Sequence, residues 1–205
     1  LYRKENILKI KAPTGVDELK RIQSISQGGV TTSVKYLELT PDNIANTSFY
    51  KKLKEETYPY YSLNRIDKGF AVSQLEQQGR KQDFRYRGST ANLQGRGIIG
   101  YHQSARSSWY ADGLENAKIW YGTEIDPLKE GLPAKEWSIR TNNESKVFPT
   151  NISVNNTELL TFKSIDYKID KMINNQVVTA VPDADKSKVV TAIKPFVSIE
   201  KLFLE

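Results

Sequence analysis

The chain has 205 residues, enough for one or two domains with a buried core, and only 38% of them are hydrophobic. Eleven Tyr, seven Phe and three Trp supply the large side chains that disordered chains lack, so a folded, polar-surfaced protein is expected. The absence of Cys excludes disulfides, thiolate metal sites and cysteine nucleophiles. No apolar run approaches the roughly 20 residues of a membrane-spanning helix, and no signal peptide is recognisable. Because the sequence starts without Met, we expect a fragment of a longer chain.

The formal net charge of +6 raises the question of nucleic-acid binding. Residues 1–100 hold 17 Lys and Arg against 10 Asp and Glu, whereas residues 101–205 hold 13 against 14. The excess is scattered, and Glu55 and Glu56 directly follow the lysine cluster at 51–54. Phosphate binding normally needs a concentrated basic face, so the charge pattern argues against a nucleic-acid partner.

Short runs of β-branched and aromatic residues, bounded by Gly, Asn, Asp and Pro, predict strands along the chain. Residues 22–25 and 30–39 predict a β-hairpin that turns at Gly28 and Gly29. Further strands are expected at residues 70–75, 83–87, 98–103, 107–110, 118–120, 135–141, 159–169 and 176–181. The pattern favours an all-β protein with antiparallel strands.

Two short helices remain possible within this all-β pattern. One runs from Asn43 towards Leu53 behind a cap at Thr40, Pro41 and Asp42, and the other covers residues 16–22. Neither is long enough to change the fold class.

Turn-forming residues in the last third of the chain predict several turns and a boundary between modules. The Asn-rich residues 141–157 favour a loop or a boundary between modules, and residues 182–188 favour another turn. Asn174 and Asn175 predict a tight turn that pairs residues 161–171 with residues 176–181. The pair Lys194 and Pro195 is expected to interrupt the chain again.

One block combines aromatic residues with closely spaced glycines. It consists of Tyr86, Gly88, Gly95, Arg96, Gly97, Gly100 and Tyr101. The last three glycines spell G-x-G-x-x-G, but a dinucleotide site needs a strand before this motif and a helix after it, and residues 102–110 carry no helical apolar stripe. We therefore favour a structural role at a β-bulge or tight bend, with Arg96 as an outward or inter-strand partner.

The arrangement Y-x-G followed by G-R-G-x-x-G-[FY] resembles the signature of Rhs-repeat proteins and of the B component of insecticidal toxin complexes. The segment from Thr32 to Thr40, with Tyr36, Leu39 and Thr40 in place, resembles the T-x-[IV]-x-Y-x-x-L-T stretch that precedes it, and the likeness spans about residues 15 to 141. Tyr101 replaces the usual Phe. Asp126 and Pro127 begin like the D-P-x-G self-cleavage core of this family, but the Gly is missing.

The resemblance implies a non-catalytic piece of a secreted or cell-surface protein whose spiralling β-sheet shell encloses or presents a toxin or effector domain. Its partners would be the remainder of the parent polypeptide and the effector domain or the secretion machinery. Residues 1–141 would form the Rhs-like segment, and residues 142–205 a β-rich continuation of uncertain family. No cofactor is expected.

The sequence contains residues that could form a catalytic triad, a calcium loop or a glycosidase acid pair, but each set has a simpler structural interpretation. His102, Ser107 and Asp112 could form a triad, yet such residues are common and His102 suits a strand. Asp183, Asp185 and Ser187 imitate a calcium loop, but two lysines, 188 and 194, occupy the positions that need Gly and Glu. Acids that could supply a glycosidase pair are Glu115, Glu124, Asp126, Glu130 and Glu136, and no spacing selects a pair.

Aromatic residues near these acids keep one alternative open, a carbohydrate- or surface-binding module of an adhesin. The possible ligand face comprises Trp109, Tyr110, Trp120, Tyr121 and Trp137. Aromatic rings can stack on sugar rings, but core packing is the more usual role of such side chains. The adhesin hypothesis predicts a contiguous exposed patch.

Overall fold

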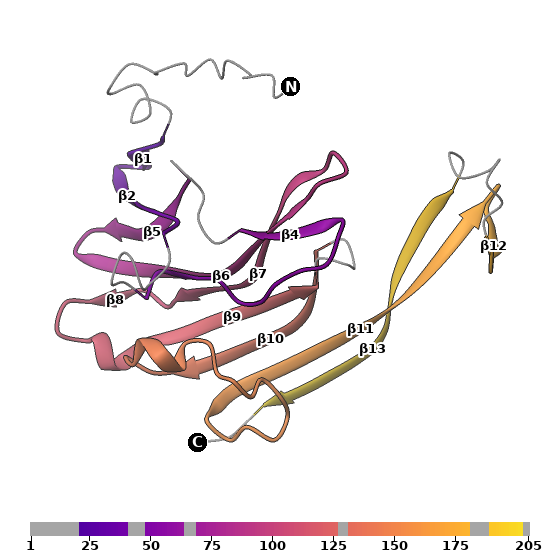
Figure 1. Cartoon of the computed structure of the whole chain (residues 1–205). Coiled ribbons are helices and arrows are strands. Elements are labelled where there is room, and N and C mark those ends of the chain that lie inside the picture. The colour runs from indigo at the N-terminus through magenta and orange to yellow at the C-terminus, as the bar shows by residue number, and fades with distance from the viewer. Residues whose placement is uncertain (1–20, 41–47, 64–68, 127–130, 181–188, 203–205) are drawn as a thin grey trace, which may run out of the picture.

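A computed structural model describes residues 21–40, 48–63, 69–126, 131–180 and 189–202 (Figure 1). These residues build one 13-stranded sheet and two short 3-10 turns, η2 (Glu115–Ala117) and η4 (Glu144–Lys146). The strands are β1 (Ser24–Gln27), β2 (Val30–Glu38), β3 (Tyr50–Lys51), β4 (Tyr60–Leu63), β5 (Phe70–Gln77), β6 (Arg80–Asn92), β7 (Gly97–Ser107), β8 (Tyr110–Ala111), β9 (Ile119–Asp126), β10 (Leu132–Arg140), β11 (Leu159–Ile173), β12 (Gln176–Val178) and β13 (Val190–Leu202). The predicted all-β class is confirmed.

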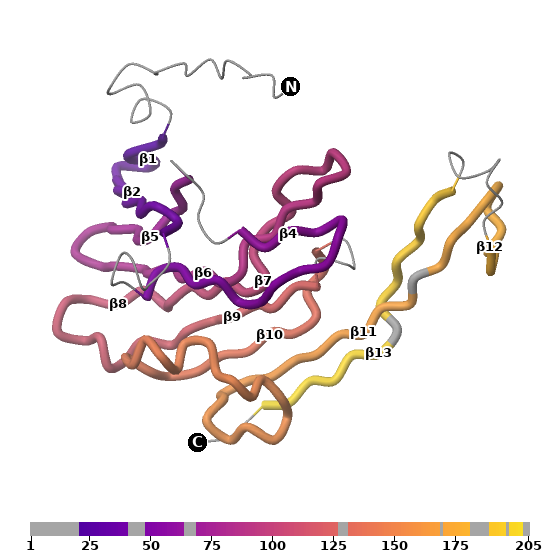
Figure 2. Tube along the Cα trace, in the orientation of Figure 1, coloured from indigo at the N-terminus to yellow at the C-terminus, as the bar shows by residue number. Residues whose placement is uncertain are grey.

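The main path of the sheet runs β1-β2-β5-β6-β7-β9-β10-β11-β12, and β13 pairs with β11. All pairs are antiparallel except β3 with β6. The sheet twists from β2 to β10, and the long β11–β13 ribbon projects away from the rest (Figures 1 and 2). The right-handed twist of successive strands produces this shape.

Several predicted elements are confirmed with shifted bounds. The first hairpin is β1–β2, turning at Gly28 and Gly29, and β2 alternates between half-buried and exposed side chains as its sequence suggests. The turn at Asn174 and Asn175 also forms, with both residues at positive φ.

Other predictions are wrong or fall largely outside the described residues. Residues 107–110 are not one strand, because β7 ends at Ser107 and β8 begins at Tyr110. The expected helix towards Leu53 lies largely outside the described residues, and its described part contains strand β3. The helix at 16–22 and the turn at 182–188 also lie largely or wholly outside them.

The partner of β11 differs most from expectation. Its pairing with β12 covers only residues 171–173, whereas β13 pairs with β11 from Thr161 to Met172. Lys194 and Pro195 do not end the strand, because β13 continues through a register shift beside Asp166 and Tyr167. Proline is tolerated there because the register shift already interrupts the ladder and β13 has no second neighbour among the described strands.

Two hydrophobic clusters hold the sheet together. The larger joins Ala105, Trp120, Trp137, Ile139, Leu159 and Phe162 of the sheet with Val147 and Ile152 of the segment at 141–158. This segment crosses one face of the sheet in front of β10 (Figure 1), so we call it the covering segment and that side the covered face. The smaller cluster contains Leu39, Phe49 and Tyr50, packed against Ala71, Tyr86 and Tyr101. The division expected near residue 141 therefore runs through a shared core.

Among the described residues, no helix has the length and apolar character needed to cross a membrane.

Candidate functional site

The glycine block forms the β6–β7 hairpin. Gly95 and Gly97 adopt positive φ in the turn, and Gly100 adopts φ 150° next to a register shift between Thr90 and Ala91. These glycines therefore lie at a tight turn and beside a β-bulge. The dinucleotide interpretation is excluded, since the motif joins two antiparallel strands and no helix follows it.

Gly88 serves a different purpose in the middle of β6. It lies opposite the backbone around His102 with φ 62°, and an added Cβ would stand 2.9 Å from Leu53 Cβ and 3.2 Å from His102 Cβ. The segment after β3 therefore crosses β6 at the one position where no side chain intervenes. Close backbone approach is a common reason for glycine inside a strand.

The two tyrosines of the block meet across the hairpin. The rings of Tyr86 and Tyr101 have centroids 4.5 Å apart, and Phe49 packs edge-on against Tyr86 at 5.4 Å. The Tyr86 hydroxyl donates to the Val72 carbonyl at 3.0 Å. Burial, with the nearby Tyr101, raises the pKa of Tyr86 to about 12. Arg96 is exposed in the turn.

The five aromatic residues of the possible ligand face do not form one surface. Trp120 and Trp137 are 1% and 2% exposed in the larger cluster, and Tyr110 is buried as well. The indole N–H groups of the two buried tryptophans donate to backbone carbonyls of the covering segment. Trp120 donates to Thr141 at 3.1 Å, and Trp137 donates to Val147 at 3.3 Å. Only Trp109 and Tyr121 are exposed, at 39% and 48%.

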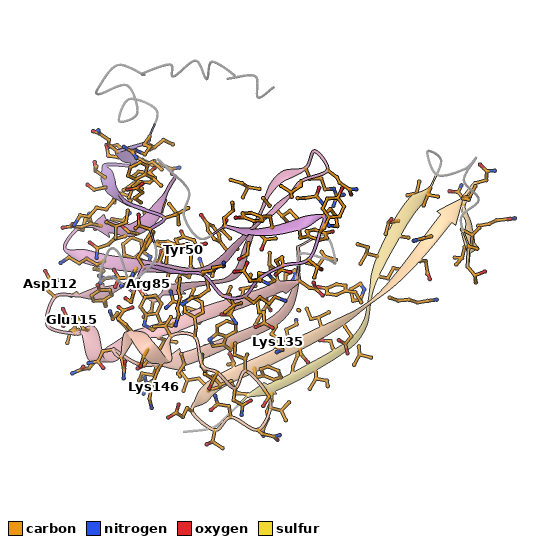
Figure 3. The ribbon with its side chains drawn as sticks, viewed as in Figure 1. Tyr50, Arg85, Asp112, Glu115, Lys135 and Lys146 are labelled. Atoms are coloured by element: carbon orange, nitrogen blue, oxygen red, sulfur yellow. The ribbon has the colours of Figure 1, made fainter. Side chains whose placement is uncertain are left out.

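Charged contacts fasten the covering segment to the sheet. Arg85 on β6 donates to Glu144 in two hydrogen bonds, Nε to Oε2 at 2.8 Å and Nη2 to Oε1 at 2.7 Å, and Ser48 adds a third at 2.9 Å. The Arg85 guanidinium also lies 5.3 Å from the Trp120 ring centroid. Figure 3 shows Arg85 on the sheet and Lys146 on the covering segment. Bidentate, charge-assisted pairs of this kind are among the stronger polar contacts in proteins.

A buried polar network lies where β6 meets β8 and the start of β9. Asp83 accepts hydrogen bonds from Tyr110 at 2.8 Å, Gln74 at 2.8 Å and Lys118 at 3.2 Å. Burial of Asp83 raises its pKa, but the hydrogen bonds from Gln74 and Tyr110 and the charges of Arg85 and Lys118 outweigh this and leave the pKa lowered. Burial and the Asp83 contact raise the pKa of Tyr110. The network stabilises the carboxylate form of Asp83.

The residues drawn as a catalytic triad are not brought together. His102 Nε2 contacts Glu56, the Ser107 hydroxyl accepts from the Asp83 amide at 2.8 Å, and Asp112 pairs with Lys81 at 2.6 Å. Asp112 lies beside Glu115 at the outer edge (Figure 3). No group of three His, Asp or Glu side chains within the described ranges could hold a metal ion, and residues 183, 185 and 187 fall outside those ranges.

The acids suggested as a glycosidase pair are likewise dispersed. Glu124 contacts Lys135 at 3.2 Å and accepts from Gln103 at 2.7 Å, whereas Glu136 lies on the opposite face. Glu130 lies outside the described residues.

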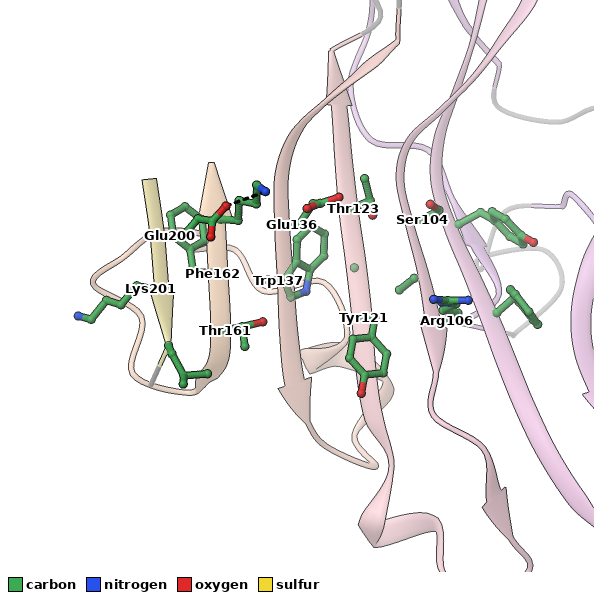
Figure 4. Close-up of a pocket in the computed structure, with 16 residues that line it drawn as sticks. Ser104, Arg106, Tyr121, Thr123, Glu136, Trp137, Thr161, Phe162, Glu200 and Lys201 are labelled. Carbon is green, nitrogen blue, oxygen red and sulfur yellow. Dashed lines mark ion pairs between the residues drawn. The ribbon is translucent and has the colours of Figure 1, made fainter. Parts of the chain in front are cut away.

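The side of the sheet opposite the covering segment, here called the open face, carries a groove with a volume of 830 Å³ (Figure 4). Strand register sets its lining in two rows that cross β6, β7, β9, β10, β11 and β13. The first row is Phe84, Arg106, Tyr121, Ser138, Thr161 and Leu202, and the second is Tyr86, Ser104, Thr123, Glu136, Lys163 and Glu200. All but Ser138 line the groove.

Three of these side chains belong to sets selected from the sequence, each for a different reason: Tyr86 in the glycine block, Tyr121 in the possible ligand face and Glu136 among the candidate acids. Alternation along β9 does place Tyr121 and Thr123 on one side and Trp120 on the other. The cross-strand neighbours depend on register, which the sequence pattern leaves open.

The sheet also ends in exposed apolar edge residues. Val197, Ile199 and Leu202 on β13 are 39%, 48% and 68% exposed. At the other end of the sheet, Ile22 and Ile25 are more than half exposed in and beside β1. Such edges can accept a further strand.

Comparisons with known proteins give no relative: no family model, no curated protein and no solved structure matches this chain.

Proposed function

We propose that the chain is a non-catalytic structural segment of a large secreted or cell-surface Rhs-family protein, whose β-shell encloses or presents a toxin or effector domain. Its partners are then the remainder of the parent polypeptide and the effector domain or the secretion machinery. The sequence signature that suggested this family falls on the β6–β7 hairpin, in the middle of the strand order.

The observation that carries the proposal is that the sheet is incompletely covered. Folded domains bury sheet faces against another layer. Here the covering segment packs on one face of β7 to β11, the opposite face of these strands carries the groove, and no described strand lies beside the outer edge of β13. An extended sheet with an open face and a free edge suits a segment that continues into neighbouring strands.

The chemistry of the open edges agrees with a passive role in assembly. One edge of the 13-residue strand β13 pairs with β11, while the N–H and C=O groups of its outer edge face no described strand, and Val197, Ile199 and Leu202 on it are exposed. Added strands would satisfy these backbone groups and cover the apolar side chains. A shell built in this way needs continuity of hydrogen bonding and no reactive group.

The decisive experiment reads the full-length gene product for further Y-x-G and G-R-G-x-x-G repeats and for a downstream D-P-x-G core. Repeats on both sides of this segment support the proposal. A gene product that encodes the 205-residue chain alone, and that purifies as a stable, cooperatively unfolding monomer, overturns it.

A further inference from the structure

The open-face groove has the dimensions of a site for an extended ligand. It crosses six neighbouring strands, and at a spacing of about 4.8 Å per strand this corresponds to roughly 24 Å. Its volume is 830 Å³, and the close-up in Figure 4 shows lining residues spread over several neighbouring strands. A chain molecule fits this shape better than a compact cofactor, which normally needs an enclosing cavity.

An exposed aromatic ring occupies the middle of the groove. Tyr121 is 48% exposed, and its hydroxyl makes no hydrogen bond with another described residue. The backbone that carries this ring is held from behind, because the strand neighbours Trp120 and Gly122 belong to the packed, covered face. A ring that is fixed at its base and bare on its surface provides a stacking platform at little entropic cost.

Polar groups surround this ring on neighbouring strands. Arg106 lies directly across from Tyr121 on β7, and Ser138 lies across from it on β10, hydrogen-bonded to Thr161 at 2.7 Å. One row further along are Thr123 and Glu136, which are also direct cross-strand partners. Directly opposed residues have Cβ atoms about 5 Å apart, so all of these groups lie within reach of a ligand that rests on Tyr121.

The charged side chains in the groove differ in whether they have an ion-pair partner. Lys163 pairs with Glu200 at 2.7 Å, and Glu136 also contributes to the raised pKa of Lys163, after Glu200. The Arg106 guanidinium is exposed and forms no hydrogen bond or ion pair with any described residue. The cation free to bind a ligand therefore stands beside the aromatic ring, and a carboxylate is its natural bidentate partner.

The composition disfavours a protein as the occupant. The centres of protein interfaces are depleted in Lys, Glu and Ser, and Ser104, Glu136 and Lys163 occupy the middle of the second row. Hydroxyl and carboxylate groups around the exposed Tyr121 ring instead match a ligand that has many hydroxyls and one weakly apolar face. Sugar rings combine these properties.

We propose that the open-face groove binds an acidic polysaccharide of the uronic acid type, with a sugar ring stacked on Tyr121 and its carboxylate held by Arg106. Thr123, Glu136 and Ser104 hydrogen-bond the hydroxyls of neighbouring sugar units. Binding is non-covalent and requires no metal or cofactor. It adds a ligand site to the structural role proposed above and does not depend on the parent protein being a shell.

The test is biolayer interferometry on the full 205-residue chain, immobilised at low density so that self-association does not interfere. The probes are hexasaccharides of galacturonate, mannuronate and hyaluronan, each compared with its carboxyl-reduced, neutral form. We expect at least one uronate probe to bind and its neutral form to bind about tenfold or more weakly, since charge-assisted hydrogen bonds are lost.

Variants assign the contacts. Tyr121→Ala and Arg106→Gln should each weaken uronate binding about tenfold or more, whereas Tyr121→Phe should retain it. Tyr58→Ala is the matched control, because Tyr58 is 75% exposed and does not line the groove. Circular dichroism verifies that every variant is folded. Absence of binding to all three uronates, equal binding of the neutral forms, or unchanged binding by Tyr121→Ala would overturn the proposal.

Discussion

The indole ring of Trp137 lies directly over Gly122 on the neighbouring strand. A Cβ atom added at Gly122 would stand 2.1 Å from both Cε2 and Cζ2 of this ring, and the two residues are direct partners in the β9–β10 register. Trp137 is 2% exposed in the larger hydrophobic cluster, so a shift of its ring would disturb the packing of that cluster. The glycine thus creates the slot that lets the largest side chain of β10 pack flat on the sheet.

Gly122→Ala should therefore destabilise the protein strongly, by about 3 kcal/mol or more, because overpacking forces a shift of a buried ring. Gly113→Ala is the control: that glycine has positive φ but nothing within 4 Å, so only backbone strain of about 1–2 kcal/mol is added. Urea unfolding measures both. Pairing Gly122→Ala with Trp137→Leu should recover part of the loss, and strict additivity of the two changes would contradict the packing explanation.

The hydrogen bonds that Asp83 accepts from Gln74 and Tyr110, with the charges of Arg85 and Lys118, predict a stability that depends on pH. The pKa of Asp83 is lowered in the folded protein, so its contribution is complete above the unfolded value of about 3.9 and is lost as pH falls through the folded pKa. Asp83→Asn should flatten the acid limb of a plot of unfolding free energy against pH. Thermal unfolding from neutral pH to below the pKa of ordinary carboxyls checks this, and an unchanged acid limb would refute it.

At neutral pH, Asp83→Asn leaves the buried Lys118 ammonium without its carboxylate, which should cost about 3–5 kcal/mol. The double variant Asp83→Asn with Lys118→Met should be more stable than the single one, since no uncompensated charge remains buried. The Lys81–Asp112 pair on the surface supplies a matched control, because Asp112→Asn should change stability by less than about 1 kcal/mol. Equal effects at the two sites would show that burial does not govern the cost.

The covering segment depends on Glu144 for its attachment. Glu144→Gln keeps the shape of the side chain but removes the charge that accepts two hydrogen bonds from Arg85 and one from Ser48. Destabilisation of about 1–3 kcal/mol is expected, with faster amide exchange confined mainly to residues 141–158. Glu158→Gln is the comparison, because its contact with Lys146 is exposed. Hydrogen exchange that rises equally across the sheet would argue against a local attachment.

Local pattern predicted much of this fold because strands and hairpin turns are local features. Alternation in residues 30–38 and the glycine and asparagine turns predicted β1–β2 and the end of β11. The β11–β13 pairing was missed since its strands are joined through β12 and residues 179–189, and a tight turn offered β11 a nearer partner. Val147 and Ile152 are buried without any periodic signal, because they belong to an irregular segment. The groove depends on register across six strands, which single-strand patterns do not specify.

The exposed edge of β13 predicts concentration-dependent self-association of the isolated chain. Its second half presents Val197, Ile199 and Leu202 beside unpaired backbone, which can template a strand from another molecule. Ile199→Lys should shift the association to concentrations about tenfold higher, since a lysine at an edge opposes strand pairing. Sedimentation velocity over a dilution series measures the change.

Two further variants distinguish strand pairing at the β13 edge from non-specific hydrophobic association. Val177→Lys introduces the same charge at an apolar side chain that is 59% exposed on β12, away from the β13 edge, and should leave association nearly unchanged. Pro195→Thr restores a backbone donor at the register shift that interrupts β13 and should strengthen association. If Val177→Lys reduces association as much as Ile199→Lys, exposed apolar area drives it and the edge does not. A parent protein that supplies the neighbouring strand would then not be needed to explain the behaviour of β13.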